Sequence, residues 1–69
     1  MTMTAAQFEQ LEETEAVEVL RWRFDVLIRV GFDIEQAAVA AANVEIDLHA
    51  AEDLISRGCP PETALRILM

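Results

Sequence analysis

The sequence has no lysine and no tyrosine, and only one cysteine, two glycines and two prolines among its 69 residues. With Cys59 alone, an internal disulfide is excluded. The flanks of Cys59, Gly58 and the pair Pro60-Pro61, supply no base to make it a nucleophile. We therefore expect a cysteine at a helix boundary or in the core, with an intermolecular disulfide as the alternative.

Basic residues are also scarce. The chain has five arginines and 13 acidic side chains, which gives a net charge of −8. Nucleic-acid backbones and anionic membranes favour Lys and Arg, so neither is expected as a direct partner. The first 19 residues contain no basic residue and no apolar run, and no stretch approaches the ~18 apolar residues of a membrane span. These absences predict a cytoplasmic protein without a signal peptide.

Hydrophobic residues nevertheless make up 54% of the chain, too many for a disordered acidic tail. The length allows one domain, residues 1–69. No segment alternates with the period of two that marks a half-buried strand. The predicted fold class is all-α, a small three- to four-helix bundle with a long first helix and a short C-terminal helix. Residues 1–7 are expected to be frayed, and the expected helices are 8–30, 34–43, 48–57 and 61–69.

The few glycines and aspartates punctuate these helices. Gly31 and Gly58 stand where left-handed caps would end the first and third helices. Asp33, with Gln36 three residues later, has the spacing of a capping box, and Asp47 is the N-cap candidate of the third helix.

The first helix carries two apolar groups on nearly opposite faces. One group is Val17, Leu20, Phe24, Leu27 and Ile28; the other is Val19, Trp22, Val26 and Val30. Asp25 and Arg29, at the spacing of an ion pair, lie between them, and Arg23 interrupts the other border. Either the chain wraps this helix on both sides, or the second group binds another copy, or it binds a different protein.

Catalytic patterns are missing. His49 has no second His or Cys at metal-ligand spacing, so a surface histidine is expected. The pairs Glu12-Glu13 and Glu52-Asp53 are adjacent in sequence and point to different sides of a helix. There is no phosphate-binding glycine loop and no Ser/His/Asp set. We expect a protein that is not an enzyme and that has no cofactor or metal.

The stretch from Val30 to Pro60 resembles a ubiquitin-associated (UBA) domain. The matching features are Val30-Gly31-Phe32, Glu35-Gln36, an alanine-rich second helix, Asn43-Val44-Glu45, Ala51, and Leu54-Ile55 followed by Gly58-x-Pro60. The resemblance implies a compact three-helix core over residues 20–60. It departs from the family in having Val30 in place of the loop methionine, a shorter middle and an additional C-terminal helix.

In UBA domains, the loop after the first helix and the end of the third form an apolar patch that binds ubiquitin. The resemblance therefore points to Val30, Gly31 and Phe32 in the loop and to Leu54 and Ile55 in the third helix. These residues also have ordinary structural roles. Phe32, directly before Asp33, suits a hydrophobic staple, and Leu54 and Ile55 suit the core.

Two functional hypotheses follow. The first is a non-catalytic protein–protein interaction module, acting on another protein or as a homodimer, with an apolar patch and an acidic rim. Its candidate contact residues are Val19, Trp22, Val26, Val30, Gly31, Phe32, Leu54 and Ile55. The alternative is an acidic regulator of the anti-repressor, antitoxin or DNA-mimic type, which would cover the basic surface of a nucleic-acid-binding protein. Its candidate residues are Glu9, Glu12, Glu13, Glu15 and Glu18, which also suit a solvated helix start.

Overall fold

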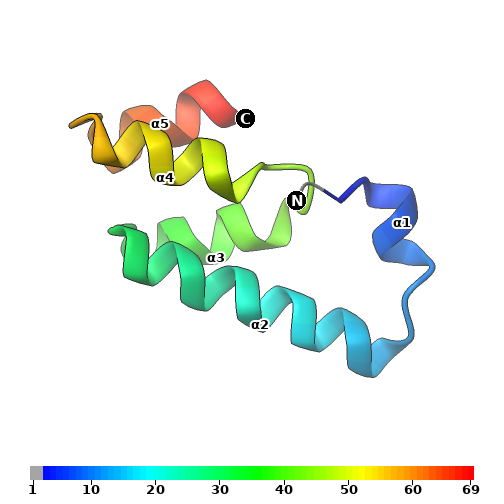
Figure 1. The fold of residues 1–69 in the computed structure, drawn as a ribbon. Helices are drawn as coiled ribbons and strands as arrows, with labels where there is room; N and C mark the ends of the chain where they lie inside the picture. Colours follow the sequence, from blue (N-terminus) through cyan, green and yellow to red (C-terminus); the bar gives the residue numbers. More distant parts are fainter. Residues whose placement is uncertain (1–2) are drawn as a thin grey trace.

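The computed structural model describes residues 3–69, and this part of the chain is helical with no strand. Its helices are α1 (Ala5–Glu9), α2 (Glu13–Val30), α3 (Ile34–Ala42), α4 (Leu48–Ser56) and α5 (Pro61–Leu68) (Figure 1). The predicted all-α fold class, a small helical bundle, is confirmed. Of the residues expected to be frayed, 1–2 lie outside the described residues, and Ala5–Gln7 are helical.

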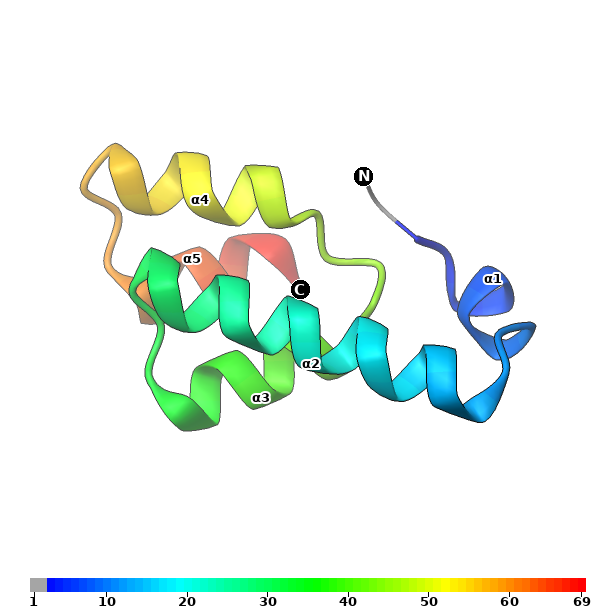
Figure 2. The same cartoon turned by 60° about the horizontal axis from the view of Figure 1, so that its bottom comes forward.

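Helices α2 to α5 form the bundle. Helix α2 packs against α3 and α4, and α5 packs against α3 and α4 on the other side. Figure 2 shows α1 at the far end of α2, away from the other helices. The core combines five alanines with four larger side chains: Ala37, Ala40, Ala41, Ala51 and Ala64, and Leu27, Phe32, Ile46 and Leu48. Alanines in α3 and α4 let these helices approach α2 and α5 closely.

The first predicted helix, 8–30, is interrupted in the structure. Residues Ala5–Glu9 form a separate helix, which Thr4 begins with a capping box. The Thr4 hydroxyl accepts from the backbone N–H of Gln7 at 3.1 Å, and the Gln7 side chain accepts from the Thr4 N–H at 3.0 Å. Helix α2 then begins at Glu13, so that Glu13 and Glu15 lie in its first turn, where the helix dipole favours acids.

The predicted caps are confirmed. Asp33 and Gln36 form a capping box, with distances of 2.7 Å and 3.1 Å between donor and acceptor atoms. Asp47 begins α4 by accepting from the backbone N–H of His49 at 2.9 Å. Gly31 follows α2 with a φ of 131°, which a residue with a Cβ rarely adopts, and its N–H donates to the carbonyls of Leu27 and Ile28.

One charged side chain is buried in the bundle. Arg23 is 3% exposed and lies on the side of α2 that also carries Leu27. Its Nε donates to the carbonyl of Ala41 at 3.1 Å, and its Nη2 donates to the carbonyls of Asn43, Ile46 and Ala40 at 2.9, 3.0 and 3.3 Å. Arg23 therefore binds the carbonyl groups that the end of α3 and the following turn leave without helical partners.

Candidate interaction groove between α2 and α4

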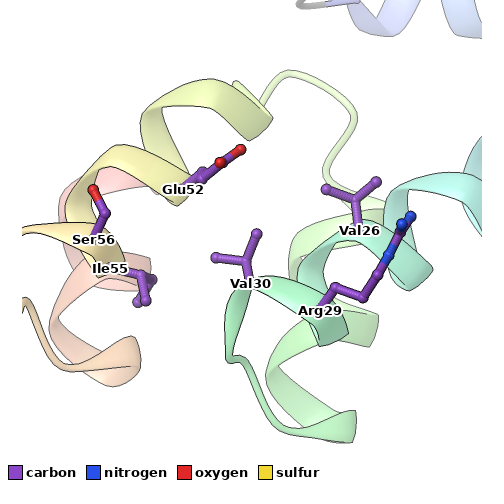
Figure 3. Close-up of a pocket in the computed structure, with 6 residues that line it drawn as sticks. All are labelled: Val26, Arg29, Val30, Glu52, Ile55 and Ser56. Carbon is purple, nitrogen blue, oxygen red and sulfur yellow. The ribbon is translucent and has the colours of Figure 1, made fainter.

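A groove of about 440 Å³ separates the C-terminal half of α2 from α4. Helix α2 contributes Val26, Arg29 and Val30 to its lining, and α4 contributes Glu52, Ile55 and Ser56. Figure 3 shows Val30 and Ile55 facing each other across the groove, with Arg29 on the α2 side and Glu52 on the α4 side. The groove thus has an apolar floor of three aliphatic side chains and a polar rim on each side.

Helical periodicity explains this lining. Val26 and Val30 are four residues apart and share one side of α2, while Leu27 between them points into the core and is fully buried. Gly31 lies close to α4, since a Cβ at this position would be 3.6 Å from Cγ2 of Ile55, an ordinary van der Waals distance. The positive φ of Gly31 turns the chain at the end of α2, next to the part of the groove that Val30 and Ile55 line.

The structure brings several of the predicted contact residues together. Val26, Val30 and Ile55 line the groove, and Gly31 is exposed beside Ile55. Trp22 is 55% exposed. It precedes Arg29 by seven residues, which is about 20° short of two helical turns, so both side chains project from the same rim of α2.

The other predicted contact residues lie deeper. Phe32 is 3% exposed and belongs to the core, so in this structure it is not on the surface available to a partner. Its burial fits the staple role, since it lies directly before the N-cap Asp33. Leu54 is half-buried against the core, and Val19 is half-buried on α2.

Neither of the two apolar groups of α2 is wholly buried or wholly exposed. The core lies between them, so that Phe24 of one group and Val26 and Val30 of the other all pack against it. Val17, Trp22 and Ile28 at the outer edges of the groups remain exposed. Helix α2 is therefore covered from both sides by α3 and α4, while its outer surface carries exposed apolar side chains.

The two charges of the groove have no ionic partner within residues 3–69. The close pairs of opposite charge in this part of the chain are Asp53–Arg57 at 3.2 Å and Asp47–His49 at 4.0 Å. The spacing of Asp25 and Arg29 predicted an ion pair. Instead, Nε of Arg29 lies 3.4 Å from the backbone carbonyl of Asp25. Arg29 and Glu52 are both exposed, on opposite sides of the groove.

The acidic excess of the chain is carried by exposed side chains. The pKa of Arg23 is lowered by desolvation, and the negative charge of Asp47 opposes this effect. Every acidic side chain except Asp47, which is half-buried, is exposed, whereas one of the five arginines is buried. Counting the other residues of both kinds, the exposed formal charge is 4 − 12 = −8 with Asp47 left out and −9 with it.

The polar half of the site is not predictable from the sequence pattern. Nothing in the sequence groups Arg29 with Glu52 and Ser56, because it does not show which turns of α2 and α4 lie side by side. Arg23 did leave a signal. It lies within four residues of Leu20 and Leu27 in the middle of an apolar helix face, opposite a helix of alanines that leaves room for a long side chain.

A second, shallower hollow lies between α2 and α3. Its volume is about 350 Å³, and its lining is almost wholly apolar: Val17, Leu20, Arg21, Phe24, Ala38, Ala41 and Ala42. It exists because α2 is twice as long as α3 and extends beyond it.

The part of the chain that the structure describes was compared with two other kinds of functional element, a metal site and a membrane-crossing helix. Among residues 3–69, no three His, Cys, Asp or Glu side chains form a group that could hold a metal ion. Likewise, none of the helices in the described range combines the length and apolar character of a membrane-crossing segment. Comparison of the chain with models of protein families, with curated proteins and with solved structures finds no significant match.

Proposed function

We propose that the protein is a non-catalytic interaction module that binds another polypeptide in the α2/α4 groove. The observation that carries this proposal is the groove itself, which Val26, Val30 and Ile55 line with apolar side chains, together with the exposed Trp22 one turn before Val26 on α2. Burying large apolar side chains contributes about 1.5–3 kcal/mol each, so four such groups can support specific binding. A buried aromatic anchor with a polar rim is typical of protein interfaces.

The arrangement also supports a UBA-like mode of binding. Of the residues that the resemblance points to, Val30, Gly31 and Ile55 lie together at one end of the groove. The groove lining contains residues of α2 and α4 alone, so the additional helix α5, which packs behind α3 and α4, leaves it open. We propose the same use of the surface, as a protein-docking site, without assigning ubiquitin as the ligand.

A photoreactive side chain in the groove tests the proposal. Ser56 is exposed and lines the groove, so a benzophenone amino acid at position 56 would touch any bound polypeptide. The control is the same substitution at Thr63, which is exposed on α5 outside the groove. Irradiation of cells that contain the protein should give a defined covalent adduct from position 56 and none from position 63.

The contribution of the indole is tested in the same assay. Trp22→Ala should lower the yield of the position-56 adduct several-fold while the far-UV circular dichroism stays unchanged, because Trp22 is largely exposed. Val39→Ala is the matched control, since Val39 is 50% exposed on α3 and lies outside the groove. The absence of any adduct at position 56, or equal adducts at positions 56 and 63, contradicts the proposed function.

A second candidate is the acidic regulator, and the exposure of its acids favours it. Of the 13 acidic side chains 12 are exposed, whereas one of the five arginines is buried. The first part of α2 presents Glu13, Glu15 and Glu18 to solvent. A partner held by these charges would dissociate as ionic strength rises, whereas a partner in the apolar groove would not. Adducts from position 56 and from Thr14, which is exposed in the first turn of α2, measured at low and high salt, distinguish the two functions.

A further inference from the structure

We infer that the groove accepts α2 of a second copy of this chain, with Arg29 of each copy paired to Glu52 of the other. This inference rests on the proposed function and specifies its partner. Three observations carry it: the two unpaired charges on opposite sides of the groove, the exposed Trp22 one turn before Val26 on α2, and the position of these features on the same pair of helices.

The charges are self-complementary. In a symmetric dimer, residue i of one copy contacts residue j of the other, and residue j of the first contacts residue i of the second. Arg29 on the α2 side and Glu52 on the α4 side are exposed, and neither forms an ion pair within residues 3–69. When a second copy places its α2 opposite α4, two Arg29–Glu52 ion pairs form between the copies, and no other residue is needed to neutralise these charges.

The symmetry that achieves this is simple. A two-fold axis that lies in the interface and runs parallel to the groove exchanges its two sides, so that α2 of one copy faces α4 of the other. The pairing requires Arg29 on α2 and Glu52 on α4, which both line the groove, to lie at similar positions along that axis (Figure 3). The same rotation leaves these positions unchanged, which brings each Arg29 to the other copy's Glu52.

The shape is complementary as well. Two concave surfaces would leave a void between them, so a convex element is needed next to the groove. Trp22 supplies it, because it is 55% exposed and projects from the same rim of α2 as Arg29. Because the rotation keeps each residue at its position along the groove, the rim of α2 in one copy lies over the groove of the other, where Val26, Val30 and Ile55 are found. Each indole, one turn before Val26, then packs at the end of the groove of the other copy.

The net charge of −16 for two copies does not exclude this dimer. At physiological ionic strength the Debye length is about 8 Å, so repulsion acts mainly between charges close to the contact. The groove lining holds one cation and one anion and is itself neutral. Many of the acids, among them Glu13, Asp33 and Glu62, lie on turns that do not line the groove.

Charge reversal followed by mixing tests the pairing. Arg29→Glu places two acids opposite each other in both contacts of the dimer, and Glu52→Arg does the same with two cations. Each single variant should dimerise about tenfold or more weakly than the parent in sedimentation equilibrium. An equimolar mixture of the two should form a heterodimer with affinity within about threefold of the parent, because both contacts are then attractive.

Matched reversals on α5 are the control. Arg66 in the last turn of α5 corresponds to Arg29 in the last turn of α2, and Glu62 is an exposed acid outside the groove. Arg66→Glu and Glu62→Arg change the net charge by the same amounts and should leave the dimer affinity unchanged. All four positions are exposed, so circular dichroism should show the parent fold in each variant.

Each other outcome overturns the inference. A parent that stays monomeric up to millimolar concentration excludes the second copy, and single variants that behave like the α5 controls exclude this face. Weakened single variants that do not recover on mixing exclude the Arg29–Glu52 pairing. A monomeric parent that still gives a position-56 adduct with another protein overturns this inference alone, whereas the loss of every adduct overturns the proposed function.

Discussion

Arg23 supplies hydrogen-bond donors inside the bundle, which an aliphatic residue cannot supply. Helix α3 is short and alanine-rich, and the turn from Asn43 to Asp47 needs donors for its carbonyl groups. One guanidinium supplies them in a fixed plane, with four contacts between 2.9 and 3.3 Å. Because its acceptors are neutral carbonyls, Arg23 orders the α3–α4 connection without a buried ion pair.

We expect Arg23→Met to destabilise the protein by about 2–4 kcal/mol, because it keeps most of the side-chain volume but leaves several buried carbonyls without a donor. Arg21→Met, two residues away and exposed, is the matched control and should change the free energy of unfolding by less than about 0.5 kcal/mol. Urea unfolding followed by circular dichroism measures both. Equal midpoints for the two variants would show that Arg23 is not needed for the turn.

Asp47 makes a second prediction at the residue scale. Its pKa is lowered, mainly by the hydrogen bond from the backbone N–H of His49. A group with a lowered pKa in the folded state stabilises the fold at pH values above its unfolded pKa, about 3.9. This contribution disappears as the pH falls through the lower folded value. Asn caps helices about as well but does not titrate, so Asp47→Asn isolates the effect.

The measurement is urea unfolding of the parent and of Asp47→Asn between pH 7 and pH 2.5. The difference in stability between them should be constant from pH 7 to about pH 5. Below about pH 4 the parent should lose stability more steeply than the variant. Parallel curves over the whole range would show that the Asp47 carboxylate is not responsible.

At the scale of elements, local chemistry made the helix ends predictable. Gly31, Asp33, Asp47 and Gly58 act through neighbours a few residues away, and the helices around them end within a residue or two of the expected positions. The break between α1 and α2 was missed because no Gly or Pro marks it. The Thr4–Gln7 capping box accounts for the start of α1, upstream of the helix start predicted at residue 8.

The apolar part of the groove lining was predictable from local patterns, and the polar part was not. Helical periodicity identified Val26 and Val30 as one face, and the resemblance to UBA domains pointed to Ile55. Which polar residues border that face depends on how α2 and α4 are aligned. This alignment is set by contacts between distant parts of the chain, such as Gly31 with Ile55 and Arg23 with Ile46. Helical periodicity in a single sequence does not predict such contacts between distant residues.

Gly31 provides the prediction at this scale. With a φ of 131°, an L-residue is strained, and Gly31→Ala should destabilise the protein by about 1–3 kcal/mol. The new Cβ would meet Ile55 at 3.6 Å, an ordinary contact, so the cost comes from the backbone and not from a clash. A synthetic chain with D-alanine at position 31 is the control, because D-residues favour positive φ, and it should regain most of the stability.

Thermal unfolding followed by circular dichroism compares the glycine, L-alanine and D-alanine chains. If the two alanine chains are equally destabilised, the cost does not come from the positive φ at position 31. If neither is destabilised, the loop after α2 tolerates another conformation, and the alignment of α2 with α4 does not depend on Gly31.

The whole molecule combines a small core with a strongly acidic surface. Most of its buried hydrophobic residues are alanines or medium-sized side chains, and Leu27 is the one large side chain in the described range with less than 2% exposure. A chain of this size buries only about 60% of the surface of its unfolded form, which leaves a narrow margin of stability. Repulsion among the surface acids reduces that margin, and a partner in the groove would restore part of it.

Ionic strength should therefore change the stability of the isolated chain. Raising NaCl from 10 mM to 100 mM shortens the Debye length from about 30 Å to about 10 Å, which screens repulsion between acids on different helices. We expect the free energy of unfolding to rise by on the order of 1 kcal/mol over this range. The experiment is urea unfolding at a fixed protein concentration below that at which the chain dimerises.

The triple variant Glu9→Gln/Glu18→Gln/Glu45→Gln, in which all three positions are exposed and outside the groove, should show a distinctly weaker salt dependence. The buried contacts of Arg23 are shielded from solvent ions and are unchanged in both proteins, so the difference between them reports on surface charge. Equal slopes for parent and variant would mean that the acids are too far apart to repel, and that the surface charge serves binding without a cost to the fold.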